Sequence, residues 1–123
     1  MSLKSVVLIA AALGLGLAGA SAQAQDPALA PTFGNTIVST HPDGRQARLW
    51  LSADHTFRAQ GRGGNRSSGA WRVRGSRLCL SQRRPISIPF SYCHAFPQVA
   101  VGQAWNDTAS NGDHVVNRIV RGQ

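Results

Sequence analysis

The sequence contains no glutamate, and Lys4 is its only lysine. Five acidic residues, all of them aspartates, stand against thirteen basic residues, so the formal net charge is +8. A glycosidase needs two carboxyl groups on either side of one bond, and a few scattered aspartates supply such a pair poorly. The G-x-S-x-G motif that positions the nucleophile of α/β-hydrolases is absent as well. These absences favour a protein that is not an enzyme.

A long hydrophobic run is also missing. Residues 6–17 are uncharged and mostly apolar, but this stretch is shorter than the ~20 residues of a membrane-spanning helix. Lys4 precedes it, and small residues in A-x-A spacing follow it, as in Ala20-Ser21-Ala22 and Ala22-Gln23-Ala24. This pattern is typical of a secretory signal peptide. We therefore expect residues 1–24 to be removed on export, leaving a periplasmic or secreted bacterial protein without a transmembrane anchor.

Helical periodicity is scarce in the remainder of the chain. Residues 25–33 (QDPALAPTF) carry two prolines and are expected to form a linker. From Gly34 onward, short runs of β-forming residues alternate with turn residues. We therefore predict that residues 34–123 form a single all-β domain, an antiparallel meander of about eight short strands that makes a small barrel or a strongly bent sheet. The expected strands span residues 35–40, 45–52, 56–61, 70–75, 77–82, 90–96, 101–108 and 114–121.

Cysteine is scarce too, since Cys79 and Cys93 are the only two. Two cysteines in an exported chain most often pair, and the alternatives, a reactive thiol or a metal-ligand pair, lack a C-x-x-C spacing. The disulfide would close a loop of about 15 residues, for which chain-entropy arguments give roughly 3 kcal/mol of stabilisation. We expect it to join the fifth and sixth strands.

Arginine, by contrast, is abundant and clustered, with eight arginines between residues 58 and 84. No acidic residue occurs in residues 55–106 to neutralise them. Such a positive region favours anionic partners, which in the cell envelope are lipopolysaccharide or anionic polysaccharide. The alternative is a solvated basic face that only keeps the protein soluble.

The stretch GRGGNRSSG (61–69) holds one RGG triplet. We interpret residues 62–69 as a long hairpin loop in which Gly63-Gly64 and Ser67-Ser68-Gly69 supply the turn conformations. One triplet inside a hairpin is not a disordered RGG tract, and an exported protein meets little RNA. Dedicated nucleic-acid binding is therefore not expected.

The predicted turns indicate where a ligand would bind. In an up-and-down meander, successive turns alternate between the two ends, so the turns at 41–44, 62–69, 83–89 and 110–113 share one end. Loops on a rigid scaffold usually carry the binding residues. The predicted ligand-binding residues at this end are Arg62, Arg66, Arg83, Arg84, His41 and His114.

Three histidines, His41, His55 and His114, each have an aspartate within two positions. Such pairs can support acid–base catalysis or metal binding. None has a metal-ligand spacing such as H-x-x-x-H, and all three fall at predicted turns, where both residue types are common. We therefore expect no catalytic residue, no metal and no cofactor.

The chain also carries a family resemblance. It rests on the order of Gly34-Asn35-Thr36, Trp71, Leu78-Cys79-Leu80, Tyr92-Cys93 and Val101-Gly102 with Trp105, which resembles that of a group of small exported β-domain proteins of alphaproteobacteria. The resemblance covers most of the chain after the signal peptide. It implies a periplasmic location and a β fold, and it supplies no catalytic residue. A looser likeness is to small periplasmic inhibitors of metalloproteases, which are β-barrels with one disulfide.

These patterns together predict a non-enzymatic periplasmic β-domain protein that binds an anionic envelope component or acts as an envelope-associated module. Two alternatives stay open. One is a small hydrolase or metal-dependent enzyme at the loop-rich end, and the other is a protease inhibitor.

Overall fold

A computed structural model of the protein describes residues 26–123. The expected signal peptide, residues 1–24, lies outside the described residues and stays a prediction, as does the periplasmic location. Within residues 26–123, no helix is long and apolar enough to cross a membrane.

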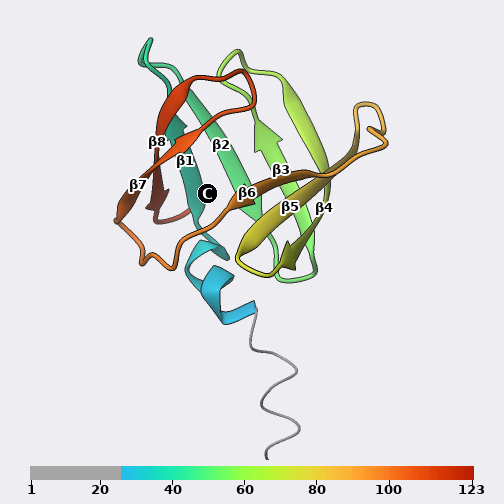
Figure 1. Ribbon diagram of the computed structural model, residues 1–123, viewed down its shortest axis with the longest axis horizontal. Coiled ribbons are helices and arrows are strands. Elements are labelled where there is room, and N and C mark those ends of the chain that lie inside the picture. Colours follow the sequence, from blue (N-terminus) through green and yellow to red (C-terminus); the bar gives the residue numbers. More distant parts are fainter. Residues whose placement is uncertain (1–25) are drawn as a thin grey trace, which may run out of the picture.

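Eight antiparallel strands make up almost all of the described fold (Figure 1). Strands β1 to β6 form a meander, and the β7–β8 hairpin adds to the free side of β1, so the sheet order is β6-β5-β4-β3-β2-β1-β8-β7. The predicted all-β meander is confirmed. The strands are β1 (Thr36–Thr40), β2 (Gln46–Leu51), β3 (Thr56–Gln60), β4 (Arg66–Arg74), β5 (Arg77–Arg84), β6 (Tyr92–Ala95), β7 (Ala104–Thr108) and β8 (His114–Val120).

Alternating side chains build a core inside the curled sheet. Along β2, Leu49 and Leu51 face inward while Arg48 and Trp50 face outward, as the sequence predicted. Successive residues of a strand point to opposite faces, so each strand contributes one row of side chains to the interior. The buried apolar residues of the strands that meet there are Ile37, Leu51, Phe57, Trp71, Leu78 and Ile119.

The sheet curls until its two edge strands, β6 and β7, approach each other. Within residues 26–123 no backbone ladder joins these strands, and side chains meet across the opening instead. The rings of Phe96, directly after β6, and Trp105 on β7 lie edge to face with centroids 5.4 Å apart. His94 Nδ1 on β6 lies 3.8 Å from Asp107 Oδ2 on β7. The fold is therefore a half-barrel whose opening, the β6–β7 seam, is closed by side chains.

One end of the half-barrel is covered by the short 3-10 helix η2 (Asp26–Thr32), which lies below the strands in Figure 1. Leu29 is only 1% exposed and belongs to the core. The Phe33 ring packs against Trp71, with centroids 5.9 Å apart. Residues 25–33, expected to form a linker, thus include side chains that fill the end of the barrel, because Leu29 and Phe33 bury apolar surface there.

Strand β4 begins earlier than the sequence predicted. The β3–β4 turn is tight, since the N–H of Gly61 donates to Asn65 O at 2.8 Å. Ser67 and Ser68 already pair with β3, so they are strand residues and not the turn residues that we expected. The expectation of a long loop over 62–69 is therefore wrong, because polar serines were assigned to a loop although they continue the ladder.

Gly69, also expected in the turn, has a different role. It lies opposite Phe57 on β3, next to an irregularity in the β4–β5 ladder. A Cβ atom on Gly69 would lie 1.9 Å from the Ser81 carbonyl oxygen. Glycine is required here because the two strands approach too closely for any side chain.

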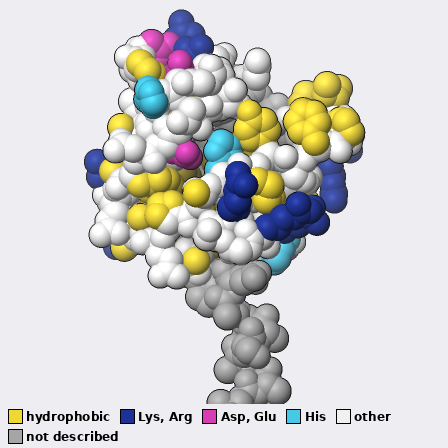
Figure 2. All heavy atoms as spheres, viewed as in Figure 1, with side chains coloured by type: hydrophobic (Ala, Val, Ile, Leu, Met, Phe, Trp, Pro, Cys, Tyr) yellow, Lys and Arg dark blue, Asp and Glu magenta, His cyan; other side chains and the backbone are white. Residues whose placement is uncertain are grey.

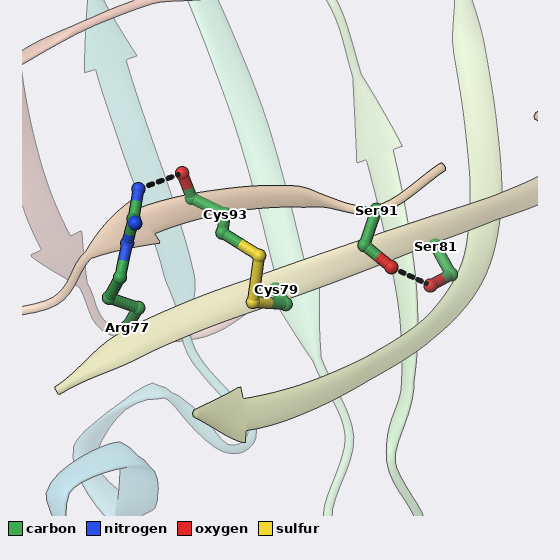
Figure 3. The surroundings of a disulfide bond; sticks show 5 residues. All are labelled: Arg77, Cys79, Ser81, Ser91 and Cys93. Atoms are coloured by element: carbon green, nitrogen blue, oxygen red, sulfur yellow. Dashed lines mark hydrogen bonds between the residues drawn. A yellow bond between two sulfur atoms is a disulfide. The ribbon is translucent and has the colours of Figure 1, made fainter. Parts of the chain in front are cut away.

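The predicted disulfide between Cys79 and Cys93 is present (Figure 3). The two residues lie opposite each other in the β5–β6 ladder. On one side of the disulfide, the hydroxyl groups of Ser81 and Ser91 are hydrogen-bonded at 2.8 Å. On the other side, Arg77 Nη2 donates to Cys93 O at 3.2 Å. These contacts fasten the short edge strand β6 to the rest of the sheet.

Candidate ligand-binding site

The loop end of the half-barrel lies opposite η2. It consists of the β1–β2 turn, the β3–β4 turn, the β5–β6 loop and the β7–β8 turn, which is the grouping that the alternation of turns predicted. Side chains connect three of these segments, because Arg62 reaches Asp43 and His41 reaches Asp113. The loop end is therefore a single surface built from distant parts of the sequence.

An open cavity of about 600 Å³ lies inside the half-barrel and reaches the loop end. Each of the eight strands contributes to its wall. Its volume is in the range of small-molecule sites, roughly 300–1,000 Å³. Space is left because several inward positions carry small side chains, namely Ser39, Ala47, Ala59 and Ser67. Small residues at alternate strand positions are only a weak signal of the cavity in the sequence, because the space depends on all eight strands together.

One wall of the cavity is apolar. Strands β2, β3 and β5 supply Leu49, Ala59 and Leu80, and the β5–β6 loop adds Ile88 and Phe90 toward the loop end. This wall suits an apolar chain or ring, because burying apolar surface away from water is the main source of affinity in such sites.

A polar strip runs along the other wall, from β1 through β8 and β7 to β6. Ser39 Oγ donates to Asn117 Oδ1 at 2.5 Å, and Asn117 Nδ2 donates to Asp107 Oδ2 at 3.4 Å. The same Asp107 oxygen faces His94 Nδ1 across the β6–β7 seam, where the two form an ion pair whenever the imidazole is protonated. The strip offers hydrogen-bonding groups to a ligand, so the cavity is polar on one side and apolar on the other.

His41 lies at the rim of this cavity and is buried. Its Nδ1 lies 3.0 Å from Asp113 Oδ2, and Asn111 Nδ2 donates to the same oxygen at 3.1 Å. These hydrogen bonds, the one with His41 above all, hold the pKa of Asp113 below its usual value. The aspartate that pairs with His41 is thus Asp113, which is distant in the sequence. Asp43, the aspartate close to His41 in the sequence, has another partner.

That partner is Arg62, whose Nη1 donates to Asp43 Oδ2 at 2.7 Å. The pKa of Asp43 is lowered chiefly by a hydrogen bond from the backbone N–H of Arg45, and the charges of Arg62 and Arg45 lower it further. The expectation that no carboxylate neutralises the predicted arginines is therefore wrong for Arg62, because the fold brings a neighbouring turn to it.

The remaining predicted residues lie outside the cavity. Arg66 opens β4, while Arg83 and Arg84 end the adjacent strand β5, and all three are exposed at the loop end. None of the three has an ion-pair partner within residues 26–123. His114 faces outward at the start of β8 and does not join His41. The role of these residues in binding stays a prediction.

A second group of arginines lies on the outer face of the sheet, and the sequence analysis did not predict this cluster. Arg48 and Arg118 lie on either side of Val38 in the ladder, and the Arg58 guanidinium lies over the Trp50 ring, 5.1 Å from its centre. The sequence pattern placed Arg48 and Trp50 on one face of β2. It could not place Arg118 beside them, because β8 meets β1 only through a long-range pairing.

Two His–Asp pairs, His41–Asp113 and His94–Asp107, are the titratable pairs that the described residues place at the cavity. Residues 26–123 contain no group of three or more His, Cys, Asp or Glu side chains that could hold a metal ion. Both cysteines are in the disulfide, and the serine of the polar strip, Ser39, donates to an amide oxygen and not to a base. A covalent mechanism requires a nucleophile next to its base, and the strip does not provide that pair.

No protein-family model matches the chain, and comparison with curated proteins and with solved structures finds no match either. The resemblance to small exported β-domain proteins therefore stays a prediction. Function has to be inferred from the cavity, the loop end and their charges.

Proposed function

We propose that this protein is a non-enzymatic binding module of the bacterial envelope, whose half-barrel holds the apolar part of an anionic amphiphile. The observation that carries the proposal is the open cavity of about 600 Å³ with one apolar wall. A cavity of this kind is the default binding site of a small barrel. An acyl chain or a comparable apolar group is the part of an envelope molecule that would gain most from entering it.

Charge suggests how such a ligand is oriented. The chain has a formal net charge of +8, and Arg66, Arg83 and Arg84 at the loop end lack carboxylate partners among the described residues. An anionic head group is attracted toward that end. Deeper in the cavity it would face the Asp107 carboxylate, which repels it. The apolar chain therefore enters the cavity and the head group stays at the loop end.

Intrinsic fluorescence provides a direct test. Of the three tryptophans, Trp105 lines the cavity, whereas Trp50 lies on the outer face and Trp71 in the core. Titration with dodecanoate should change the emission in a saturable way with a stoichiometry of one, and Trp105→Phe should remove most of that change. Dodecanol, which lacks the charge, should bind more weakly than dodecanoate. Turnover of an acyl ester in a separate assay would favour the hydrolase alternative instead.

A pair of alanine-to-phenylalanine variants tests whether the ligand occupies the cavity. Ala59→Phe places a ring in the cavity, whereas Ala104→Phe places the same ring on the exposed outer side of β7. Displacing about two methylene groups of the ligand, at ~0.8 kcal/mol each, raises Kd by about tenfold or more for the first variant and leaves the second unchanged. Ala47→Phe serves as a second filler if the first fails to fold. Undiminished affinity in a folded filler variant contradicts the proposal.

A further inference from the structure

The β5–β6 loop, residues 85–91, projects from the loop end and carries the two most exposed large hydrophobic side chains among the described residues, Ile86 and Phe90. Ile86 is 68% exposed and Phe90 64%, and Tyr92 at the start of β6 is 41% exposed. Figure 2 shows hydrophobic side chains gathered on this projecting part at the right of the molecule, with basic side chains next to them. Exposed apolar groups that gather in this way mark a surface that binds a membrane, another protein or a ligand.

Two arginines stand at the base of this loop. Arg83 and Arg84 directly precede it and are exposed. They form no ion pair with any residue in 26–123, and the sequence has no acidic residue from 55 to 106. Arg62 is different, because Asp43 compensates its charge. The uncompensated positive charge of the loop end therefore lies beside the exposed hydrophobic side chains.

Hydrogen bonds hold the loop in a defined shape. The N–H of Ile88 donates to Gln82 O at 3.0 Å, and Gln82 Nε2 donates to Ile86 O at 3.2 Å. The Ser81–Ser91 hydrogen bond and the disulfide fix the strands from which the loop departs. Ile86 is thus exposed on a hairpin whose shape is held by these hydrogen bonds and by the disulfide.

We propose that the β5–β6 loop docks the protein on the surface of an anionic phospholipid bilayer. The side chains of Ile86 and Phe90 enter the region of the head groups, while Arg83 and Arg84 bind lipid phosphates. A combination of apolar insertion and basic side chains is what interfacial membrane binding requires. Phe90 also lines the cavity, so docking brings the cavity close to the lipid surface. The docking goes beyond the proposed ligand binding, and either one can fail without the other.

Co-sedimentation with vesicles tests the docking. The protein should bind vesicles that contain phosphatidylglycerol and bind phosphatidylcholine vesicles much more weakly. Ile86→Ser should lower the partition coefficient by about tenfold, since it removes the insertion of one large apolar side chain. Arg83→Ser/Arg84→Ser should lower the partition coefficient by about tenfold or more at low salt. The difference should be smaller at high salt, because screening weakens the vesicle binding of both the parent and the variant. The emission of Ile86→Trp should shift to the blue on binding.

Matched controls make the result decisive. Arg72→Ser/Arg74→Ser removes the same charge from exposed positions at the other end of β4, and Val116→Ser removes an exposed apolar side chain from the outer face of β8. Both controls should bind vesicles nearly as the parent does. Equal losses for the two arginine pairs would mean a diffuse basic surface and overturn the proposal. Unchanged vesicle binding of Ile86→Ser would also overturn the proposal. The same holds if Arg83→Ser/Arg84→Ser weakens retention on heparin but does not weaken binding to vesicles.

The cavity and the membrane surface are separable in these assays. Ala59 lines the cavity and Ile86 does not, so Ala59→Phe should keep vesicle binding while losing dodecanoate binding. Ile86→Ser should keep dodecanoate binding, because Ile86 does not line the cavity. If the protein binds dodecanoate normally but does not bind anionic vesicles, the docking proposal is overturned and the proposed ligand binding is not.

Discussion

Leu29→Ala tests whether η2 belongs to the folded domain. The Leu29 side chain is 1% exposed and packs in the core, so its removal costs the transfer free energy of the side chain and leaves a cavity. Fully buried Leu→Ala substitutions cost about 2–5 kcal/mol. A loss of about 3 kcal/mol lowers Tm by roughly 12–24 °C in a domain of this size, at about 4–8 °C per kcal/mol.

The assay is thermal unfolding followed by circular dichroism, with Ile86→Ala as the control. Ile86 loses a side chain of the same size, but it is 68% exposed, so the free energy of unfolding should change by no more than about 0.5 kcal/mol. If the two variants melt within a few degrees of each other, residues 25–33 behave as a linker, and the assignment of η2 to the core is refuted.

Three further predictions concern the frame of the half-barrel. Cys79→Ala/Cys93→Ala, or reduction of the parent protein, should lower the free energy of unfolding by roughly 3 kcal/mol, and mass spectrometry that finds two free thiols in fresh protein would contradict the disulfide. Gly69→Ala should cost at least about 1–3 kcal/mol in chemical unfolding, because its Cβ would overlap a backbone carbonyl, and a neutral effect would refute that close approach. The pKa of Asp113 is lowered in the folded protein, so its contribution to stability is fully present above the unfolded value of about 3.9 and is lost as the pH falls through the folded value. Asp113→Asn should therefore reduce the stability at pH 7, and it should also reduce the loss of stability on acidification below about pH 4. Urea unfolding at several pH values tests this, and equal pH slopes for the variant and the parent would count against it.

The sequence predicted the strands well wherever side chains alternate strictly. Leu49 and Leu51 against Arg48 and Trp50 indicated both the strand and its buried face, and turn residues marked most strand ends. The serines before Gly69 misled, because a polar, glycine-containing stretch has the composition of a loop even where it pairs in a ladder. Leu29 was overlooked for a related reason, since a short proline-containing helix has no periodicity that reveals its burial.

The site was harder to predict than the fold. The alternation of turns placed His41 and Arg62 at one end, and the structure confirms that position. Their partners, Asp113 and Asp43, could not be assigned, because the approach of two turns depends on the curl of the sheet. The cavity depends on the summed volume of inward side chains across eight strands, which no single stretch of sequence discloses.

The β6–β7 seam is a line along which the half-barrel can widen without breaking interstrand hydrogen bonds. In a fully closed barrel, hydrogen-bonded ladders fix the circumference, and any widening breaks interstrand hydrogen bonds. Here the two edges meet through the Phe96–Trp105 rings and the His94–Asp107 pair. Widening at this line separates side chains and leaves every ladder intact. We therefore expect the cavity to widen around a thicker ligand at the cost of only a few side-chain contacts, since no interstrand hydrogen bond among the described residues crosses this line.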